Sequence, residues 1–291
     1  MHNFVILTDS SCDLTGAMVE QLELEVLPLS VTVEEDTYKN YPDEREITAK
    51  TFYDKIREGK KVFTSAVNTQ AFTDAMEPLL QQGKDILYIG FSSGLSGTYS
   101  AGAAAARELQ EKYPARRIMT VDSLCASMGQ GLLVYLSVLQ KRLGKTIEEV
   151  KKYAEEIKLK VCHWFTVEDL SQLRKGGRVS AASALVGNIL NIKPVMHVDD
   201  QGKLAAVSKV RGRKASIRTM FENMGKTIEA PDGQSVFISH GDCEKEAKTL
   251  GDMIREKWSG IREIIYNNVG PVIGAHTGPG VIALFYLGKH R

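Results

Sequence analysis

Three short apolar runs in the first half of the chain constrain its fold more than any other feature of the sequence. They are FVILT (4–8), ILYIG (86–90) and IMTV (118–121), which run almost without polar interruption. Strands of this kind are buried on both faces, as in a parallel sheet covered by helices. Amphipathic segments follow the three runs at 14–24, 97–113 and 126–144. This alternation predicts βαβ units and therefore an α/β domain.

The pattern changes near residue 160. Thr146 and Glu149 stand at capping-box spacing, which predicts a helix that ends near Lys160. VCHWFTV (161–167) then opens a second set of elements, in which KPVMHVDDQGKLAAVSKV (193–210) predicts an antiparallel hairpin. We therefore expect two domains with a ligand between them. Residues 1–160 form a Rossmann-like parallel sheet with helices on both faces, and residues 161–291 form an α/β domain with a mixed sheet.

Several further elements are expected within these two domains. LEVLPLSVTVEEDTYKNY (24–41) alternates in polarity and predicts a strand or hairpin that leaves the main sheet. Helices are expected at 167–177 and 181–192, and the apolar segment VIALFYLG (281–288) is expected to form a helix after a glycine-rich loop.

Composition excludes several classes of function. The 37 basic and 36 acidic residues give a net charge of +1, so no global field attracts nucleic acid or an anionic membrane. The four cysteines are far apart and form no CxxC pair, which favours reduced thiols in the cytoplasm over disulfides or a metal site. We expect no signal peptide and no integral membrane segment, because no stretch of about 18 apolar residues occurs.

Nucleotide signatures are also missing from the sequence. No GxGxxG follows the first predicted strand, and no GxxxxGK[ST] occurs anywhere. We therefore expect no nucleotide cofactor and no metal.

The segment FSSGLSGTYS (91–100) places six hydroxyl side chains and two glycines directly after a predicted strand. Ligands of open α/β sheets lie at this edge, where glycines allow close backbone approach and helix N-termini favour anions. Similar turns occur at Thr8–Ser11, Thr64–Phe72 and Val121–Ser123. Each turn alone is explained by helix capping, since Ser, Thr, Asp and Asn are preferred caps. Together, they indicate a site rich in neutral hydrogen-bond donors.

A serine hydrolase is the alternative interpretation. GLSGT resembles the GxSxG elbow, and the order Ser96, Asp122, His276 is that of a hydrolase triad. Thr98 replaces the last glycine of the elbow, however, and Ser96 comes several residues after the strand ends.

The glycine-rich segment GPVIGAHTGPG (270–280) frames His276 and Thr277. A histidine in such a loop can donate a hydrogen bond to a carboxylate, or to a backbone carbonyl with no function beyond structure. His240, in SHGD, has less support as a site residue. Two basic turns, LRKGGRVS and KVRGRKAS, carry Arg178, Arg211 and Arg213, which are either solvated or able to clamp an anion or an acidic partner.

These motifs together closely resemble the DegV family of bacterial fatty-acid-binding proteins. The resemblance runs nearly from end to end, through TDSSCDL, TSAVNTQAF, FSSGLSGTYSAG, VDS, the long segment LRKGGRVSAASALVGNILNIKPVMHVDDQGKLAAVSKVRGRKAS, SHGD and GPVIGAHTGPGVIALFY. It implies a two-domain DegV-like fold that holds one long-chain fatty acid in a buried tunnel, without catalysis and without a cofactor. The segment LVGNILNI (185–192) and the predicted helix at 281–288 are candidates for apolar walls.

The resemblance also implies which residues form the site. The carboxylate would contact Thr64 and Ser65, either Ser93 or Ser96, and His276 with Thr277. Arg178, Arg211 and Arg213 would serve ligand closure or partner docking. Some family members present the bound lipid to the separate catalytic subunit of a fatty acid kinase for phospholipid synthesis, which implies a kinase partner here. This chain departs from the family's usual TSQPS at Ala66, Val67 and Asn68.

Overall fold

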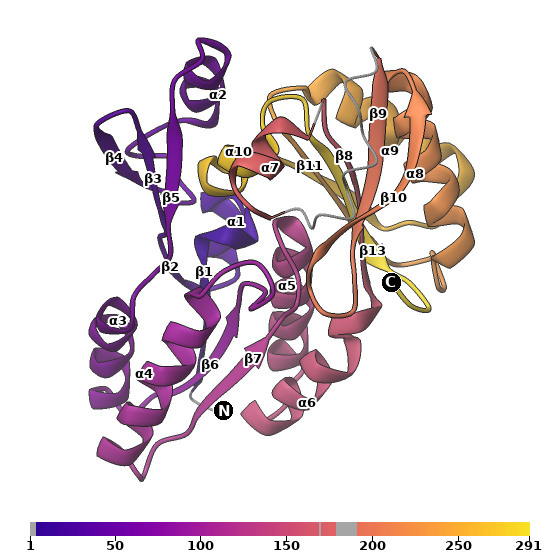
Figure 1. Cartoon of the computed structure of the whole chain (residues 1–291). Helices are drawn as coiled ribbons and strands as arrows, with labels where there is room; N and C mark the ends of the chain where they lie inside the picture. Colours follow the sequence, from indigo (N-terminus) through magenta and orange to yellow (C-terminus); the bar gives the residue numbers. More distant parts are fainter. Residues whose placement is uncertain (1–3, 169, 179–190) are drawn as a thin grey trace.

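A parallel four-stranded sheet forms the first half of the computed structural model, which describes residues 4–168, 170–178 and 191–291 (Figure 1). Its order is β2-β1-β6-β7. The strands are β1 (Phe4–Asp9), β2 (Glu25–Leu27), β6 (Asp85–Gly90) and β7 (Ile118–Asp122). The helices are α1 (Gly16–Gln21), α3 (Thr69–Gln81), α4 (Thr98–Lys112), α5 (Met128–Arg142) and α6 (Ile147–Ile157), with short 3-10 helices η1 (Ser10–Cys12) and η2 (Lys158–Lys160).

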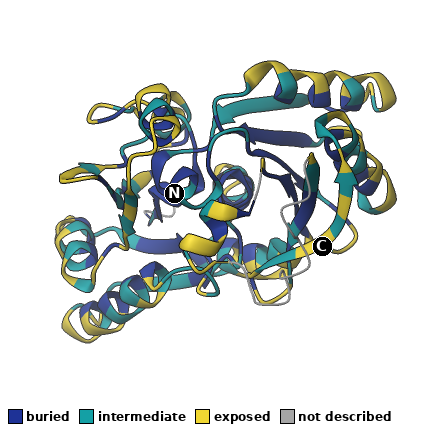
Figure 2. Ribbon diagram, turned by 45° about the horizontal axis from the view of Figure 1, so that its top comes forward, coloured by how far each residue is buried: buried dark blue, intermediate teal, exposed yellow. Residues whose placement is uncertain are grey.

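Helices cover both faces of this sheet, as the apolar runs predict. Leu7, Ile86 and Tyr88 belong to a hydrophobic cluster that contains side chains of α3 and α4. Ile6 and Leu87, which point the other way, belong to a second cluster with side chains of α5 and α6. Nearly all residues of β1 and β6 are therefore buried, because each face has its own helical layer, whereas β7 is mostly half-buried. Figure 2 shows buried residues dark blue in the interior and exposed residues on the outer surfaces of the helices.

The second half contains a mixed six-stranded sheet in the order β10-β9-β8-β13-β11-β12. β11 and β12 are parallel and the other neighbours are antiparallel. The strands are β8 (Val161–Thr166), β9 (Ile192–Val198), β10 (Leu204–Arg211), β11 (Ser235–His240), β12 (Glu263–Asn268) and β13 (Ile282–Leu287). The helices are α7 (Ser171–Lys175), α8 (Arg213–Thr227), α9 (Glu244–Lys257) and α10 (Pro271–Thr277). The α/β class with two separate sheets is thus confirmed.

Helix α5 lies between the two sheets and contacts strands of both (Figure 1). One hydrophobic cluster consequently runs from Ile6 through Leu132 to Phe237. The strands of the parallel sheet precede residue 160 and those of the mixed sheet follow it. Because the two halves share one hydrophobic core, the core does not mark a boundary between two domains. The division into domains at residue 160 therefore stays a prediction.

A third, smaller sheet stands apart from the main one, as the alternation in 24–41 predicts. It contains β3 (Ser30–Val33), β4 (Asp36–Lys39) and β5 (Val62–Ser65), in the order β4-β3-β5 and antiparallel throughout. Helix α2 (Ala49–Arg57) completes this unit. β3, β5 and α2 all contact α10 from the other half of the chain. The small sheet thus forms a wall opposite α10.

The expectation for the last part of the chain is wrong. The segment around His276 is the helix α10, which begins with Pro271 in its first turn, and residues 282–287 form strand β13 instead of a helix. β13 lies between β8 and β11, so it is buried on both faces and has no polar alternation to mark it as a strand.

The other elements predicted from the sequence are confirmed in part. The capping box at Thr146 and Glu149 and the hairpin of β9 and β10 are confirmed. The helix expected at 167–177 is limited to α7. Most of the helix expected at 181–192, and with it most of the proposed wall LVGNILNI, lies outside the described residues.

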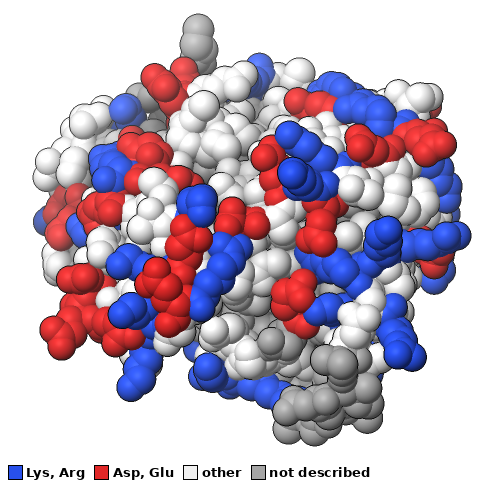
Figure 3. All heavy atoms as spheres, turned by 90° about the horizontal axis from the view of Figure 1, so that it is seen from above, with Lys and Arg blue, Asp and Glu red and all other residues white. Residues whose placement is uncertain are grey.

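Surface charge agrees with the near-neutral composition. Basic and acidic side chains intersperse over the face shown in Figure 3. Within the described ranges, no helix has the length and hydropathy needed to cross a bilayer.

Candidate functional site

A cavity lies between the two halves of the molecule. Apolar side chains from both halves line most of it, among them Leu29, Phe91, Leu95, Phe165, Val198, Leu204, Val272 and Phe285. Its polar lining residues include Thr64, Ser65, Ser96, Arg178, His276 and Thr277. The cavity can therefore hold an apolar chain that ends in a polar group.

Thr64 and His276 meet across this cavity. The Thr64 hydroxyl lies 2.9 Å from His276 Nε2. Thr64 is carried by β5 of the small sheet and His276 by the last turn of α10. The contact joins residues 212 positions apart, so the site exists only when the small sheet packs on α10.

The other ring nitrogen of His276 is buried and has no hydrogen-bond partner among the residues that the structure describes. Burial, together with the positive charge of Arg178, lowers the pKa of His276 to about 4. The ring is therefore neutral near pH 7 and carries one N–H. A buried donor or acceptor without a partner is costly, so Nδ1 is a position that favours a polar ligand atom.

Gly176 borders the space beside this nitrogen. A Cβ atom at position 176 would lie 2.2 Å from His276 Nδ1. Only glycine allows the turn after α7 to approach the imidazole so closely.

The two candidate serines of FSSGLSG differ in position. Ser96 lines the cavity, and its hydroxyl lies 2.9 Å from that of Thr98. Ser93 is exposed and does not line the cavity, while its backbone N–H donates to Asp122 Oδ1. The geometry therefore favours Ser96 for a ligand contact.

The groups of the hydrolase alternative are engaged elsewhere. His276 Nε2 faces Thr64, and Asp122 Oδ1 accepts N–H groups from Ser93 and Leu124. No hydrogen bond within the described ranges joins Ser96 to His276 or His276 to Asp122. This arrangement does not activate Ser96 as a nucleophile.

The remaining predicted residues of the mouth have local partners. Ser65 is exposed at the rim, and Thr277 donates its hydroxyl proton to Ile273 of its own helix. Arg178 is exposed and donates from Nε to the carbonyl oxygen of Leu95, at 3.3 Å. Arg178 therefore links the turn after α7 to the loop that carries Ser96.

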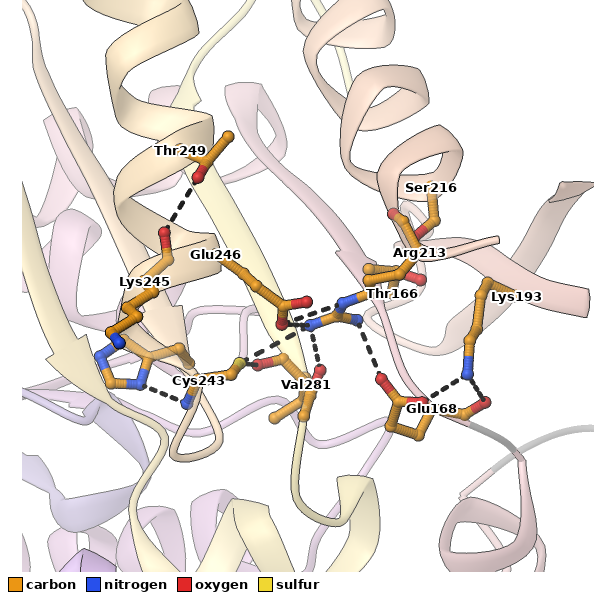
Figure 4. Close-up of polar contacts among 12 residues, drawn as sticks. Thr166, Glu168, Lys193, Arg213, Ser216, Cys243, Lys245, Glu246, Thr249 and Val281 are labelled. Carbon is orange, nitrogen blue, oxygen red and sulfur yellow. Dashed lines mark hydrogen bonds and ion pairs between the residues drawn. The ribbon is translucent and has the colours of Figure 1, made fainter. Parts of the chain in front are cut away.

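Arg211 and Arg213 lie outside the cavity lining. Arg211 is exposed at the end of β10, whereas the Arg213 side chain is only 14% exposed. Its guanidinium donates to Glu246 at 3.0 Å and to the carbonyl oxygen of Gly280, and it lies 3.8 Å from Glu168 (Figure 4). These contacts leave Arg213 unavailable for direct docking and make it a support for the segments around α7 and α10.

The side chains of the motif TDSS were expected at the polar edge of the sheet. They form hydrogen bonds in the protein interior instead. Thr8 donates to the carbonyl oxygen of Ile89, and the Ser10 hydroxyl accepts from the N–H of Leu29. Asp13, a few residues later, accepts from the Ser127 hydroxyl and from the N–H of Gly270. His240 is buried at the end of β11, and its Nδ1 accepts from the N–H of Cys243. Of these contacts, the one between Asp13 and Gly270 joins the two halves.

Two buried lining residues, Ser127 and His163, were not expected from the sequence. Ser127 has φ 53°, which is rare for a residue with a side chain. Its place after the strand run IMTV was the only available signal, since that is where ligand-facing loops occur.

The three residues that depart from TSQPS have different surroundings. Asn68 caps α3 by accepting the N–H of Ala71 at 2.9 Å. Val67 is buried in the core and Ala66 lines the cavity. Of the three positions, Ala66 is therefore the one that faces a ligand.

Comparisons with known proteins agree with this fold. The profile described as "Uncharacterised protein, DegV family" matches residues 3–289. A DegV domain-containing protein of Clostridium perfringens is 45% identical, over 100% of this chain and 99% of that protein. One from Lactococcus lactis is 35% identical over 98% of each chain.

Solved structures of fatty-acid-binding proteins have the same fold. A fatty-acid-binding DegV family protein from Thermus thermophilus has a TM-score of 0.90 and 26% identity, covering 98% of this chain and 99% of that one. The fatty-acid-binding protein DegV of Bacillus subtilis has a TM-score of 0.84 and 28% identity, covering 99% and 100%. From the end-to-end match in sequence and fold, the chain belongs to the DegV family.

Proposed function

We propose that this protein binds one long-chain fatty acid in the cavity and presents it, in the cytoplasm, to a separate kinase subunit that forms the acyl phosphate. The protein itself is not an enzyme and requires no cofactor or metal. Thr64, Ser65, Ser96, His276 and Thr277 surround the carboxylate. Arg178 closes the mouth over it.

The observation that carries this proposal is the unpartnered, buried Nδ1 of His276 at the edge of an apolar cavity. His276 Nε2 lies 2.9 Å from the Thr64 hydroxyl. In the tautomer in which Nε2 accepts from that hydroxyl, the neutral imidazole carries its proton on Nδ1. That N–H donates to a carboxylate oxygen, which would be very costly to bury without partners. The fatty-acid-binding relatives of the same fold support this ligand class.

The apolar lining supplies affinity for the tail. Each methylene that leaves water contributes about 0.8 kcal/mol, so a chain of about sixteen carbons gains on the order of 12 kcal/mol before ordering costs. The polar mouth then fixes orientation more than affinity.

Two measurements test the ligand. Organic extraction of the denatured, purified protein followed by mass spectrometry should release close to one fatty acid per chain, in excess over a mock purification. Titration of the delipidated protein with palmitate should show His276→Ala binding about 5- to 150-fold more weakly, because one donor to a buried carboxylate is lost. Ser93→Ala is the matched control, since Ser93 is exposed and outside the cavity.

Failure to load any fatty acid would contradict the proposal. So would covalent labelling of Ser96 by a fluorophosphonate, since it would indicate an activated nucleophile. For the kinase partner, labelled phosphate from ATP should reach the bound fatty acid in the presence of a kinase subunit and not with the purified chain alone.

A further inference from the structure

The guanidinium of Arg291 binds backbone carbonyl groups from both halves of the chain. Nη1 donates to the carbonyl oxygens of Leu124 at 2.8 Å and Asp199 at 2.9 Å. Nη2 donates to Lys158 at 2.7 Å and lies 3.0 Å from Cys125 Sγ, and Nε donates to Val161 at 3.1 Å. No ion pair between Arg291 and a carboxylate is found in the part of the chain that the structure describes. The side chain is therefore held by carbonyl groups.

Each segment that Arg291 binds carries a residue of the cavity lining. Ala126 and Ser127 come two and three residues after Leu124, and Val198 directly precedes Asp199. His163 follows Val161 by two residues, and its Nδ1 lies 2.8 Å from the same Val161 oxygen that Arg291 binds. Ser127, His163 and Val198 are among the buried lining residues. We call these three residues and Ala126 the inner wall of the cavity. Arg291 lies behind this inner wall.

The loop in this wall needs such support. Leu124 has φ 51° and Ser127 has φ 53°, conformations that are unfavourable for residues with side chains. Strained backbone persists only where surrounding contacts determine it. The Asp199–Gly202 turn also depends on its neighbours, since the Gly202 oxygen accepts from the Ser92 hydroxyl at 2.7 Å.

We propose that Arg291 is a positioning residue that fixes the inner wall and thereby sets the longest acyl chain the cavity accepts. This inference rests on the proposed fatty-acid function. A rigid wall stops the chain at a defined carbon, and overpacking against it is unfavourable. In a variant without the Arg291 guanidinium, the inner wall can move away from the end of the acyl chain. Acyl chains that are too long for the unmodified protein therefore lose less affinity in the variant.

Lysine cannot replace this arginine. The five N–H donors of a guanidinium are spread over a plane, whereas an ammonium places three donors at one point. Arg291→Lys therefore reaches only some of the four carbonyl oxygens and behaves like Arg291→Met.

The test compares Arg291→Met and Arg291→Lys with the unmodified protein. Dissociation constants are measured for saturated fatty acids of increasing length. In the unmodified protein, affinity should rise with length and then fall on the order of tenfold at the first chain that is too long. In both Arg291 variants, the loss of affinity at the same chain length should be less than about threefold. Arg255→Met is the matched control, because Arg255 also binds a carbonyl oxygen, that of Ile261 at 2.7 Å, and neither residue lines the cavity.

A second readout needs no lipid. The Cys125 thiol is buried beside Arg291, so its alkylation, followed by peptide mass spectrometry, should be at least about tenfold faster in Arg291→Met. Millimolar methylguanidine should slow it again by filling the vacated carbonyl site. The same cation should restore the length profile, while tetramethylammonium at equal concentration should not.

The outcomes separate the two proposals. Unchanged Cys125 alkylation, or an unchanged length profile in both variants, would overturn the role of Arg291. A protein that binds no fatty acid but shows faster Cys125 alkylation in the variant and methylguanidine protection would overturn the proposed ligand. Support of the wall by Arg291 would then still hold.

Discussion

At the scale of single residues, the space beside His276 Nδ1 is the most sensitive part of the site. Gly176 provides that space without needing an unusual conformation, since its φ is −75°. A side chain is therefore excluded at position 176 by the imidazole and not by the backbone.

Gly176→Ala should weaken fatty-acid binding by on the order of tenfold or more, because the new methyl group forces the His276 ring to move. Gly97→Ala is the control. Gly97 lines the cavity and has a similar φ of −72°, but a Cβ there meets nothing within 4 Å. Titration with palmitate checks the pair, and equal affinity of the two variants would contradict the close packing.

Asp13 gives a prediction about pH. Burial raises the pKa of Asp13 to about 7, and hydrogen bonds from Ser127 and Gly270 only partly offset this. In the unfolded chain the carboxyl group has a pKa near 4, so between about pH 4 and pH 7 the folded state holds a proton that the unfolded state has lost. Folding stability therefore falls as the pH rises through this window, by up to about 1.4 kcal/mol per pH unit.

Asp13→Asn should remove this dependence, because an amide keeps one acceptor and has no charge to bury. Asparagine also tolerates the φ of 50° found at this position. Denaturant unfolding should be measured at several pH values. The free energy of unfolding of Asp13→Asn should rise relative to that of the unmodified protein from pH 5 to pH 8. A constant difference in the free energy of unfolding across that range would exclude Asp13 as the titrating group.

The sequence predicted individual site residues where a motif kept them together. Thr64, Ser96 and His276 were predicted and do line one cavity. The choice between Ser93 and Ser96 depends on how the loop turns after β6, which composition does not encode. Ser127 and His163 stand in segments without a distinctive pattern, and only the packing of α5 against the second sheet brings them to the cavity.

At the scale of elements, the junction between β10 and α8 separates two arginines with different surroundings. Arg213 begins α8 and binds Glu246, Gly280 and Glu168. Arg211, two residues earlier, is exposed and has no ion pair among the described residues.

Arg213→Met should lower the free energy of unfolding by about 1–3 kcal/mol, because it leaves the Gly280 carbonyl and Glu246 without their donor. Arg211→Met should change it by less than about 0.5 kcal/mol, as for most surface substitutions. Urea unfolding of both variants is the measurement. Equal losses would mean that the contacts of Arg213 do not stabilise the fold.

Element prediction succeeded where local chemistry was decisive. The Thr146 capping box and the hairpin of β9 and β10 are specified by residues close together in sequence. The strand β13 was predicted as a helix, since a short run buried on both faces has no periodicity to separate the two. Its pairing with β8 and β11 is a long-range contact that the local sequence does not show.

At the scale of the whole molecule, the cavity couples the two halves. Its walls include Leu29 near one end of the sequence and Phe285 near the other. A ligand that contacts both halves binds the folded state and not the unfolded chain.

Palmitate at about 100 times its dissociation constant should therefore raise the free energy of unfolding by about 2.7 kcal/mol. Calorimetry of the delipidated protein should show a higher Tm on addition of palmitate. The methyl ester, which lacks the carboxylate, should raise the Tm less. A Tm that does not respond to palmitate would argue against a ligand bound between the halves.

The position of β13 has a consequence for biosynthesis. β13 follows every other described strand in the sequence, yet it lies between β8 and β11 in the sheet. While a ribosome is still adding the residues before 282, β8 can pair only with β9 and β11 only with β12, so each keeps one unpaired edge that is prone to aggregation. Nascent chains should therefore need a chaperone until translation has passed β13, and lipid can be loaded only afterwards.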